Sequence, residues 1–302
     1  MRIVRGVLVW CRPMSIRLLP SALLVLLLLA ACDSSTASIT EVAPVPLFST
    51  GATVQALPQE AVRSEPIVVS DADLQALDLP IIMFHYVEPA PADPESMRAQ
   101  LGVTPEELES QVKALSEAGF TFYTVSDAPA LMARRLEPAQ KRVILTFDDG
   151  YEDFYLNALP ILQKYNAKAT LFVVTGFLGK PEYLSVDQLK EVAKSPLVEI
   201  ASHTVSHPDL ETLNEEQQRH EIVDSKTDLE AIIGRPVWTF AYPLGHFDET
   251  SEALAAQTYI ASVAIRGGRT QKPADIDTLR RLRIASLRGA SLRLFLEGSD
   301  PL

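Results

Sequence analysis

The amino-acid sequence predicts an α/β fold in which parallel strands alternate with covering helices. Short apolar runs alternate with helical segments between residues 79 and 284. The first helical segment lies between the first two strands, as a parallel pairing requires. Polar residues follow the ends of several strands, where parallel α/β folds bind their ligands. This pattern fits either a closed barrel or an open doubly wound sheet.

Seven or eight strands are expected from the apolar runs, which are rich in β-branched and aromatic residues. The runs are 79–87, 121–125, 142–147, 169–175, 197–202, 237–242, 260–265 and 279–284.

Helices are expected between these runs. Segment 104–120 begins with Thr104 as N-cap, Pro105 at the first helical position and Glu107 closing a capping box, and Gly119 ends it. The other predicted helices are 157–166, 185–194, 214–233 and 249–258.

The N-terminus predicts an export signal. A segment with four arginines precedes the apolar stretch "SALLVLLLLAAC", which is the order of a secretory signal. The ending Leu29-Ala30-Ala31-Cys32 resembles the lipobox of bacterial lipoproteins, in which the cysteine carries the lipid. We therefore expect residues 1–31 to be a lipoprotein signal peptide and Cys32 to be lipidated. The protein would then be anchored to a membrane of the bacterial cell envelope, facing the periplasm or the exterior.

The net charge limits the kinds of partner that the protein can bind, and the cysteine content limits how the fold can be stabilised. Removing residues 1–31 takes away four arginines and no acidic residue, so the formal charge falls from −12 to −16. Nucleic acid is excluded as a partner on this ground. A chain that keeps only Cys32 has no internal disulfide, so its core must suffice for stability.

The composition also predicts the domain boundaries. Residues 32–76 are rich in Ala, Ser, Thr, Pro and Val, which is typical of a flexible tether, and residues 77–302 are expected to form the catalytic domain.

Two adjacent carboxylates end the strand 142–147. Asp148 and Asp149 would point to opposite faces if the strand continued. Both can serve one site only if the chain leaves strand geometry there, and Gly150 supplies that freedom. One carboxylate could then bind a metal while the other takes a proton from water. The alternative is that one of them simply caps the next helix.

Two histidines follow the strand 197–202. His203 and His207 are four residues apart, which would put both imidazoles on one side of a helical turn. With one carboxylate they make a three-ligand site that suits Zn²⁺, Co²⁺ or Ni²⁺. The chain has no "HExxH", no "GxSxG" and no phosphate-binding glycine loop, so zincin, serine-hydrolase and nucleotide readings are disfavoured.

At these residues the sequence resembles the polysaccharide deacetylases of the NodB-homology type, carbohydrate esterase family 4. The motifs that carry the resemblance are "TFDDG" (146–150), "SHTVSH" (202–207) and "FAYPLG" (240–245). The opening strand "IIMFHYV" (81–87) is similar to that of the poly-N-acetylglucosamine deacetylase branch. The resemblance implies a distorted (β/α) barrel with parallel strands.

The resemblance also implies roles. Asp148 would be the catalytic base, and Asp149, His203 and His207 would bind a divalent metal, usually Zn²⁺. Tyr242, Pro243 and Gly245 would line the substrate groove, with a backbone N–H near Tyr242 holding the oxyanion.

Two usual family residues are missing, an arginine in the third motif and a late histidine. We expect Arg281 to orient Asp148 in place of the missing arginine. We expect His85, or else His246, to act as general acid in place of the missing histidine.

The implied activity is removal of N-acetyl groups, as acetate, from an N-acetylglucosamine-containing envelope or extracellular polysaccharide. Hydrolysis of O-acetyl esters and non-catalytic glycan binding remain as alternatives.

Overall fold

The predicted apolar runs form one large sheet. The computed structural model describes residues 61–283 together with 292, 295 and 298, so the predicted signal peptide and Cys32 lie outside the described residues. Nine strands make up the sheet: β2 (Ile81–Phe84), β5 (Thr121–Tyr123), β6 (Arg142–Phe147), β7 (Ala169–Val173), β8 (Val198–Ser202), β9 (Thr239–Ala241), β10 (Ala261–Ala264), β12 (Leu279–Arg280) and β13 (Leu282–Arg283). Their pairings are all parallel.

The sheet closes almost completely on itself. Its strand order is β12-β10-β9-β8-β7-β6-β2-β13, with β5 also paired to β6. The two strands at the ends of this order, β12 and β13, are joined by Arg281 alone. The ends of the sheet therefore meet, and the closed alternative of the sequence prediction, a distorted (β/α) barrel, is confirmed. The single last strand expected at 279–284 is two strands with different neighbours.

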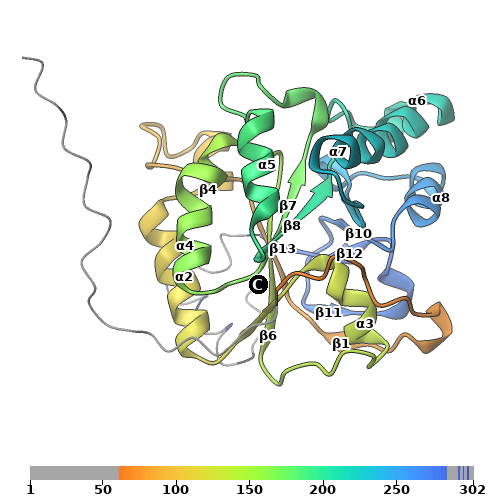
Figure 1. The fold of residues 1–302 in the computed structure, drawn as a ribbon, viewed down its shortest axis with the longest axis horizontal. Coiled ribbons are helices and arrows are strands. Elements are labelled where there is room, and N and C mark those ends of the chain that lie inside the picture. Colours follow the sequence, from red (N-terminus) through yellow and green to blue (C-terminus); the bar gives the residue numbers. More distant parts are fainter. Residues whose placement is uncertain (1–60, 284–291, 293–294, 296–297, 299–302) are drawn as a thin grey trace, which may run out of the picture. The chain divides into compact units, whose positions relative to one another are not determined.

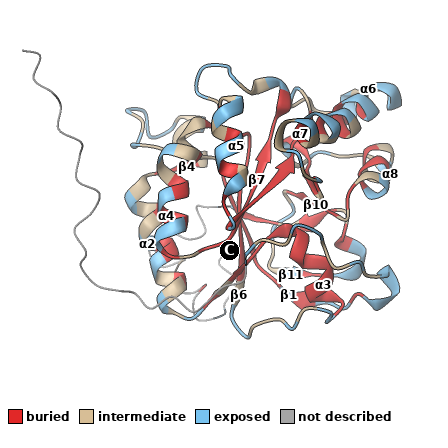
Figure 2. Ribbon diagram, in the orientation of Figure 1, coloured by how far each residue is buried: buried red, intermediate tan, exposed pale blue. Residues whose placement is uncertain are grey.

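Strand alternation separates two apolar layers. On β6, Val143, Leu145 and Phe147 belong to the outer layer beneath the helices, whereas Ile144 belongs to the cluster inside the barrel. The barrel strands are buried on both faces, and most helices show one buried and one exposed face, whereas the helix Ala128–Met132 is buried throughout (Figure 2). This explains why the strands read as continuous apolar runs rather than alternating ones.

Helices surround the sheet, and one short helix, Ala128–Met132, contributes Ala128, Leu131 and Met132 to the cluster inside the barrel. The helices are α1 (Met97–Leu101), α2 (Pro105–Glu117), α3 (Ala128–Met132), α4 (Leu159–Lys164), α5 (Val186–Lys194), α6 (Glu215–Arg219), α7 (Ser225–Ile233) and α8 (Glu249–Thr258). Helix α2 packs on α4, α5 on α7, and α6 on α8 (Figure 1). The capping box predicted for α2 is present, with Thr104 Oγ1 accepting from the Glu107 N–H. Within the described residues, no helix is long and apolar enough to span a membrane.

Two short pairings and a packed segment were not predicted. Strand β1 (Leu77–Asp78) runs antiparallel to β11 (Thr270–Gln271), and β3 (Tyr86–Val87) runs parallel to β4 (Gly102–Val103). Residues 61–76, which the sequence assigns to the tether, contact the domain, and Leu74 is buried in the cluster that fills the barrel.

Asp277, just before β12, is expected to destabilise the fold at neutral pH. Burial, and then the charges of Asp71 and Glu252, raise its pKa to about 6 from 3.8. An acid with a raised folded-state pKa costs stability above that pKa, and the cost disappears as pH falls toward 4. Asp277→Asn should therefore raise the free energy of unfolding at pH 7 by roughly 1 kcal/mol, after allowance for solvent screening. The gain should vanish near pH 4.

Thermal unfolding of both proteins at pH 7, 5.5 and 4 checks this expectation. Asp275→Asn is the matched control, because Asp275 accepts hydrogen bonds from the Lys272 N–H and the Arg280 side chain. That variant should lose stability. A lower melting temperature for Asp277→Asn at pH 7 would contradict the expectation.

Candidate active site

The C-terminal end of the barrel gathers the predicted polar side chains. Inward-facing positions alternate along a strand, so Asp148 follows the inward Thr146 and His203 follows the inward Ala201. Arg281 follows Leu279, another member of the barrel cluster. The strands therefore deliver a carboxylate, an imidazole and a guanidinium to one site.

Asp149 reaches the same site because the backbone leaves strand geometry. Its φ is 73°, and that of Gly150 is 76°. The left-handed conformation is strained for an aspartate but open to glycine. The departure that the sequence predicts is confirmed, and it begins one residue earlier than expected, at Asp149 itself. Both adjacent carboxylates thereby lie among the histidines.

Asp149, His203 and His207 form a cluster that fits a divalent cation. Asp149 Oδ1 lies 3.4 Å from Nε2 of His203 and 3.4 Å from Nε2 of His207. Ligands at tetrahedral angles on a zinc ion, with bonds of 2.0–2.1 Å, would be about 3.4 Å apart. Asp149 Oδ1 is buried and has no hydrogen-bond partner among the described residues. A buried carboxylate oxygen facing two imidazole nitrogens is satisfied by a cation.

The tautomer of His203 also suits a metal ligand. Its Nδ1 lies 2.7 Å from the carbonyl oxygen of Ala241, which can only accept, so Nδ1 carries the proton. When the imidazole is neutral, Nε2 presents its lone pair to the site. Burial lowers the pKa of His203 but Asp149 and Asp148 raise it more, so the net shift is upward. A cation binds only the neutral imidazole, so the raised pKa makes metal binding weaken as pH falls.

The connection between the two histidines is not the helical turn expected from their spacing. Residues 203–207 form a loop in which Thr204 and His207 both have positive φ, 69° and 58°. The His207 N–H donates to Thr204 Oγ1. The prediction of a helical turn is wrong, because side-chain hydrogen bonds offer the backbone an alternative to helix. The imidazoles nevertheless converge.

Asp148 lies between a guanidinium and an imidazole. Arg281 Nη1 donates to Asp148 Oδ1 over 2.7 Å, and His85 Nε2 lies 3.8 Å from Asp148 Oδ2. Burial raises the pKa of Asp148, but the charge and hydrogen bond of Arg281, together with His85 and His203, outweigh it and hold the pKa below its ordinary value. Burial lowers the pKa of His85. At neutral pH the site therefore pairs an ionised carboxylate with a neutral imidazole.

Tyr242, in the third motif, does not lie where the sequence led us to expect it. Its side chain is fully buried in the outer apolar layer beside Phe240 and Phe247, because alternation turns Ala241, not Tyr242, into the barrel. Its N–H donates to Val263. The Tyr242 side chain is therefore part of the core and is not in a position to line a groove, unlike the expectation from the sequence.

The rest of the third motif forms a tight turn, η7 (Pro243–Gly245). Pro243 is buried, and a Cβ on Gly245 would lie 2.6 Å from the Ile265 side chain. Leu244 projects from this turn, half exposed and at a φ of 59°. His246 pairs with Asp209 at the surface.

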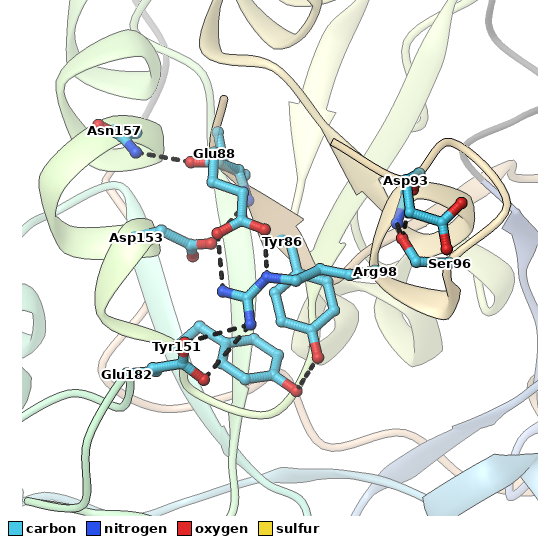
Figure 3. A network of polar contacts seen from close by, with 11 residues as sticks. Tyr86, Glu88, Asp93, Ser96, Arg98, Tyr151, Asp153, Asn157 and Glu182 are labelled. Atoms are coloured by element: carbon cyan, nitrogen blue, oxygen red, sulfur yellow. Dashed lines mark hydrogen bonds and ion pairs between the residues drawn. The ribbon is translucent and has the colours of Figure 1, made fainter. Parts of the chain in front are cut away.

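Sequence reasoning missed a tyrosine cluster beside the carboxylates. The hydroxyls of Tyr86 and Tyr151 are 2.7 Å apart, and the ring of Tyr151 stacks on Tyr183 with centroids 4.9 Å apart. Figure 3 shows Arg98 lying across Tyr86 and joining Glu88 to Glu182. The sequence offered one indication of this cluster: Tyr86 directly follows His85, and Tyr151 directly follows Gly150.

The fold and site together define a (β/α) barrel with a carboxylate–histidine centre, and known proteins are similar to this chain in sequence and fold. Residues 135–263 match the polysaccharide deacetylase family. The Bacillus subtilis protein YxkH, named as a polysaccharide deacetylase, is 31% identical over 221 residues, which are 72% of this chain and 76% of that protein. The solved structure of Streptococcus pyogenes deacetylase PplD in complex with acetate is 34% identical. Its TM-score is 0.64, with 68% of this chain and 92% of that chain covered.

The chain belongs to the polysaccharide deacetylase family, of the NodB-homology type (carbohydrate esterase family 4), as the sequence motifs predicted. It is a hydrolase that acts on amide bonds of an N-acetylated polysaccharide. A poly-β-1,6-N-acetyl-D-glucosamine N-deacetylase of Staphylococcus aureus is 35% identical over 107 residues, which are 34% of this chain and 37% of that protein. The similarity to that enzyme thus spans about a third of either chain.

Proposed function

We propose that this protein is a divalent-metal-dependent N-deacetylase of an N-acetylglucosamine-containing polysaccharide of the cell envelope. The observation that carries the proposal is the cluster of Asp149, His203 and His207 beside an Asp148 held ionised by Arg281. A binding module has no need for an ionised base next to a cation site. A cation held by the three ligands would polarise the acetyl carbonyl and lower the pKa of a water molecule, with Zn²⁺ the first choice and Co²⁺ or Ni²⁺ able to share the ligands.

The chain's own residues move the protons. Asp148 accepts the proton of the attacking water, and Arg281 keeps that carboxylate ionised and fixed beforehand. The departing nitrogen must gain a proton before the C–N bond breaks. His85, 3.8 Å from Asp148, is neutral at rest and can receive this proton and pass it to the nitrogen. Acetate and a free amine result.

The substrate class follows from the relatives and the sequence. Poly-β-1,6-N-acetylglucosamine is proposed first, because the opening strand with His85 and the Staphylococcus aureus enzyme point to it. Peptidoglycan and chitin-like oligomers fit the same chemistry. Anchoring through a lipid on Cys32 to a membrane of the bacterial envelope is part of the proposal, and it rests on the sequence of the leader alone.

Acetate release tests the proposal directly. The full-length chain, incubated with β-1,6- and β-1,4-linked N-acetylglucosamine oligomers, should release acetate. A chelator should abolish the release, and added Zn²⁺ or Co²⁺ should restore it. Release from O-acetylated glycans alone would replace the amide hydrolase by an ester hydrolase. A protein that binds the oligomers but releases no acetate, with or without metal, would overturn the proposal in favour of a binding module.

A further inference from the structure

The loop between the two histidines is held from outside the site by a buried carboxylate. Glu221, in the π-helical segment η6 (His220–Asp224), accepts the N–H groups of Val205 and Ser206 over 2.9 and 2.8 Å through Oε2. Its Oε1 accepts the Ser206 hydroxyl over 2.7 Å. Glu221 is 7% exposed. All three bonds end on the two residues that precede His207.

The loop needs such an anchor because its own conformation is costly. Thr204 and His207 both occupy the left-handed region, which costs each about 1 kcal/mol or more. On the other side, the N–H groups of Thr175 and Gly176 donate to the carbonyls of Thr204 and Val205. Gly176 permits this approach, since a Cβ there would lie 2.6 Å from the Val205 oxygen. Glu221 supplies the acceptors for the N–H groups of Val205 and Ser206 and for the Ser206 hydroxyl.

The helix is shaped to present this side chain. The segment predicted as one helix, 214–233, contains a wide π turn between α6 and α7. Such turns are uncommon and often stand at functional sites. Beyond the turn, the hydroxyl of Ser225 meets that of Ser202 at the end of β8 over 2.7 Å. The helix is thus joined to the strand end before His203 and to the loop before His207.

We propose that Glu221 is a positioning residue that sets the geometry of His207 as a metal ligand. It touches neither the cation site nor the reacting atoms, and it acts through the backbone of residues 205 and 206. Partners behind a ligand typically change metal affinity by about 10- to 100-fold when removed. This inference rests on the proposed metal site, and its test includes a measurement on the metal-free protein.

The experiment compares Glu221→Ala with Glu230→Ala in the full-length chain. Glu230 on α7 likewise accepts a backbone N–H, that of Val237, over 2.9 Å, but it lies away from the loop. Zn²⁺ is titrated against a chromophoric chelator, and amide hydrogen exchange of 203–207 is followed without metal. Glu221→Ala should bind Zn²⁺ about 10- to 100-fold more weakly and exchange faster at residues 205 and 206. Glu230→Ala should change neither measurement by more than about threefold.

The experiment distinguishes failure of this inference from failure of the proposed metal site. Unchanged exchange and unchanged Zn²⁺ affinity in Glu221→Ala would overturn the inference, as would equal losses in both variants. If wild-type protein binds no Zn²⁺, the proposed function fails, and the exchange measurement still decides whether Glu221 holds the loop. Should Glu221→Ala not fold, Glu221→Gln decides. Its oxygen can still accept both N–H groups but without charge, so an affinity loss of about fivefold is expected, and no loss would overturn the inference.

Discussion

Replacing Asp148 by asparagine is expected to lower kcat for acetate release by about 10³-fold while leaving bound metal unchanged. The amide cannot take a proton from water, but it keeps the shape of the carboxylate and can still accept from Arg281. Asp148 is not among the three groups that face the cation site, so the ligands Asp149, His203 and His207 are retained. Steady-state kinetics at saturating Zn²⁺, with metal content measured on the same sample, checks both parts.

Asp127→Asn is the matched control for this expectation. Asp127 is also a buried carboxylate, but it accepts the N–H and hydroxyl of Thr124, which follows β5 away from the cluster. Its loss should lower stability and leave kcat within about threefold. A kcat near the wild-type value in Asp148→Asn would remove Asp148 from the reaction. Loss of metal together with activity would instead make it a ligand.

The sequence was a good guide to elements whose signals are local. The apolar run 142–147 corresponds to β6 and the segment 249–258 to α8, since both depend on burial pattern and capping within a few residues. Barrel closure could not be predicted in this way. The run 279–284 looks like one strand, and its division at Arg281 arises only because β10 and β2, far apart in sequence, pair with its two halves.

The candidate site also has features that the sequence predicts and features that it does not. Motif residues such as Asp149 and His203 could be named from the sequence, because strand ends in parallel sheets meet at one edge. The loop that presents His207 could not, since its left-handed residues depend on acceptors from Glu221 and donors from Gly176. The side chain of Tyr242 was misplaced because one residue of alternation decides whether it faces the barrel or the helices.

Replacing Arg281 by methionine is expected to move the acid limb of the pH–rate profile to higher pH. Arg281 is 1% exposed, and it is the first among the groups that together hold the pKa of Asp148 below the ordinary value against the effect of burial. Asp148 must be ionised to accept a proton, so activity is lost as pH falls through its pKa. Without the guanidinium, burial dominates and that pKa rises, so the loss begins at higher pH. Breaking a buried pair also costs about 3–5 kcal/mol of stability.

Arg281→Lys separates charge from geometry in this prediction. An ammonium retains the positive charge, but it lacks the rigid planar guanidinium whose Nη1 donates to both Asp148 and Thr146. Its acid limb should stay near that of wild type, with kcat reduced because Asp148 is less well oriented. Metal content must be measured at each pH, because protonation of His203 also weakens metal binding at low pH. If Arg281→Met keeps its metal and its acid limb does not move, the ionisation of Asp148 is controlled by the other groups that lower its pKa, His85 and His203, rather than by Arg281.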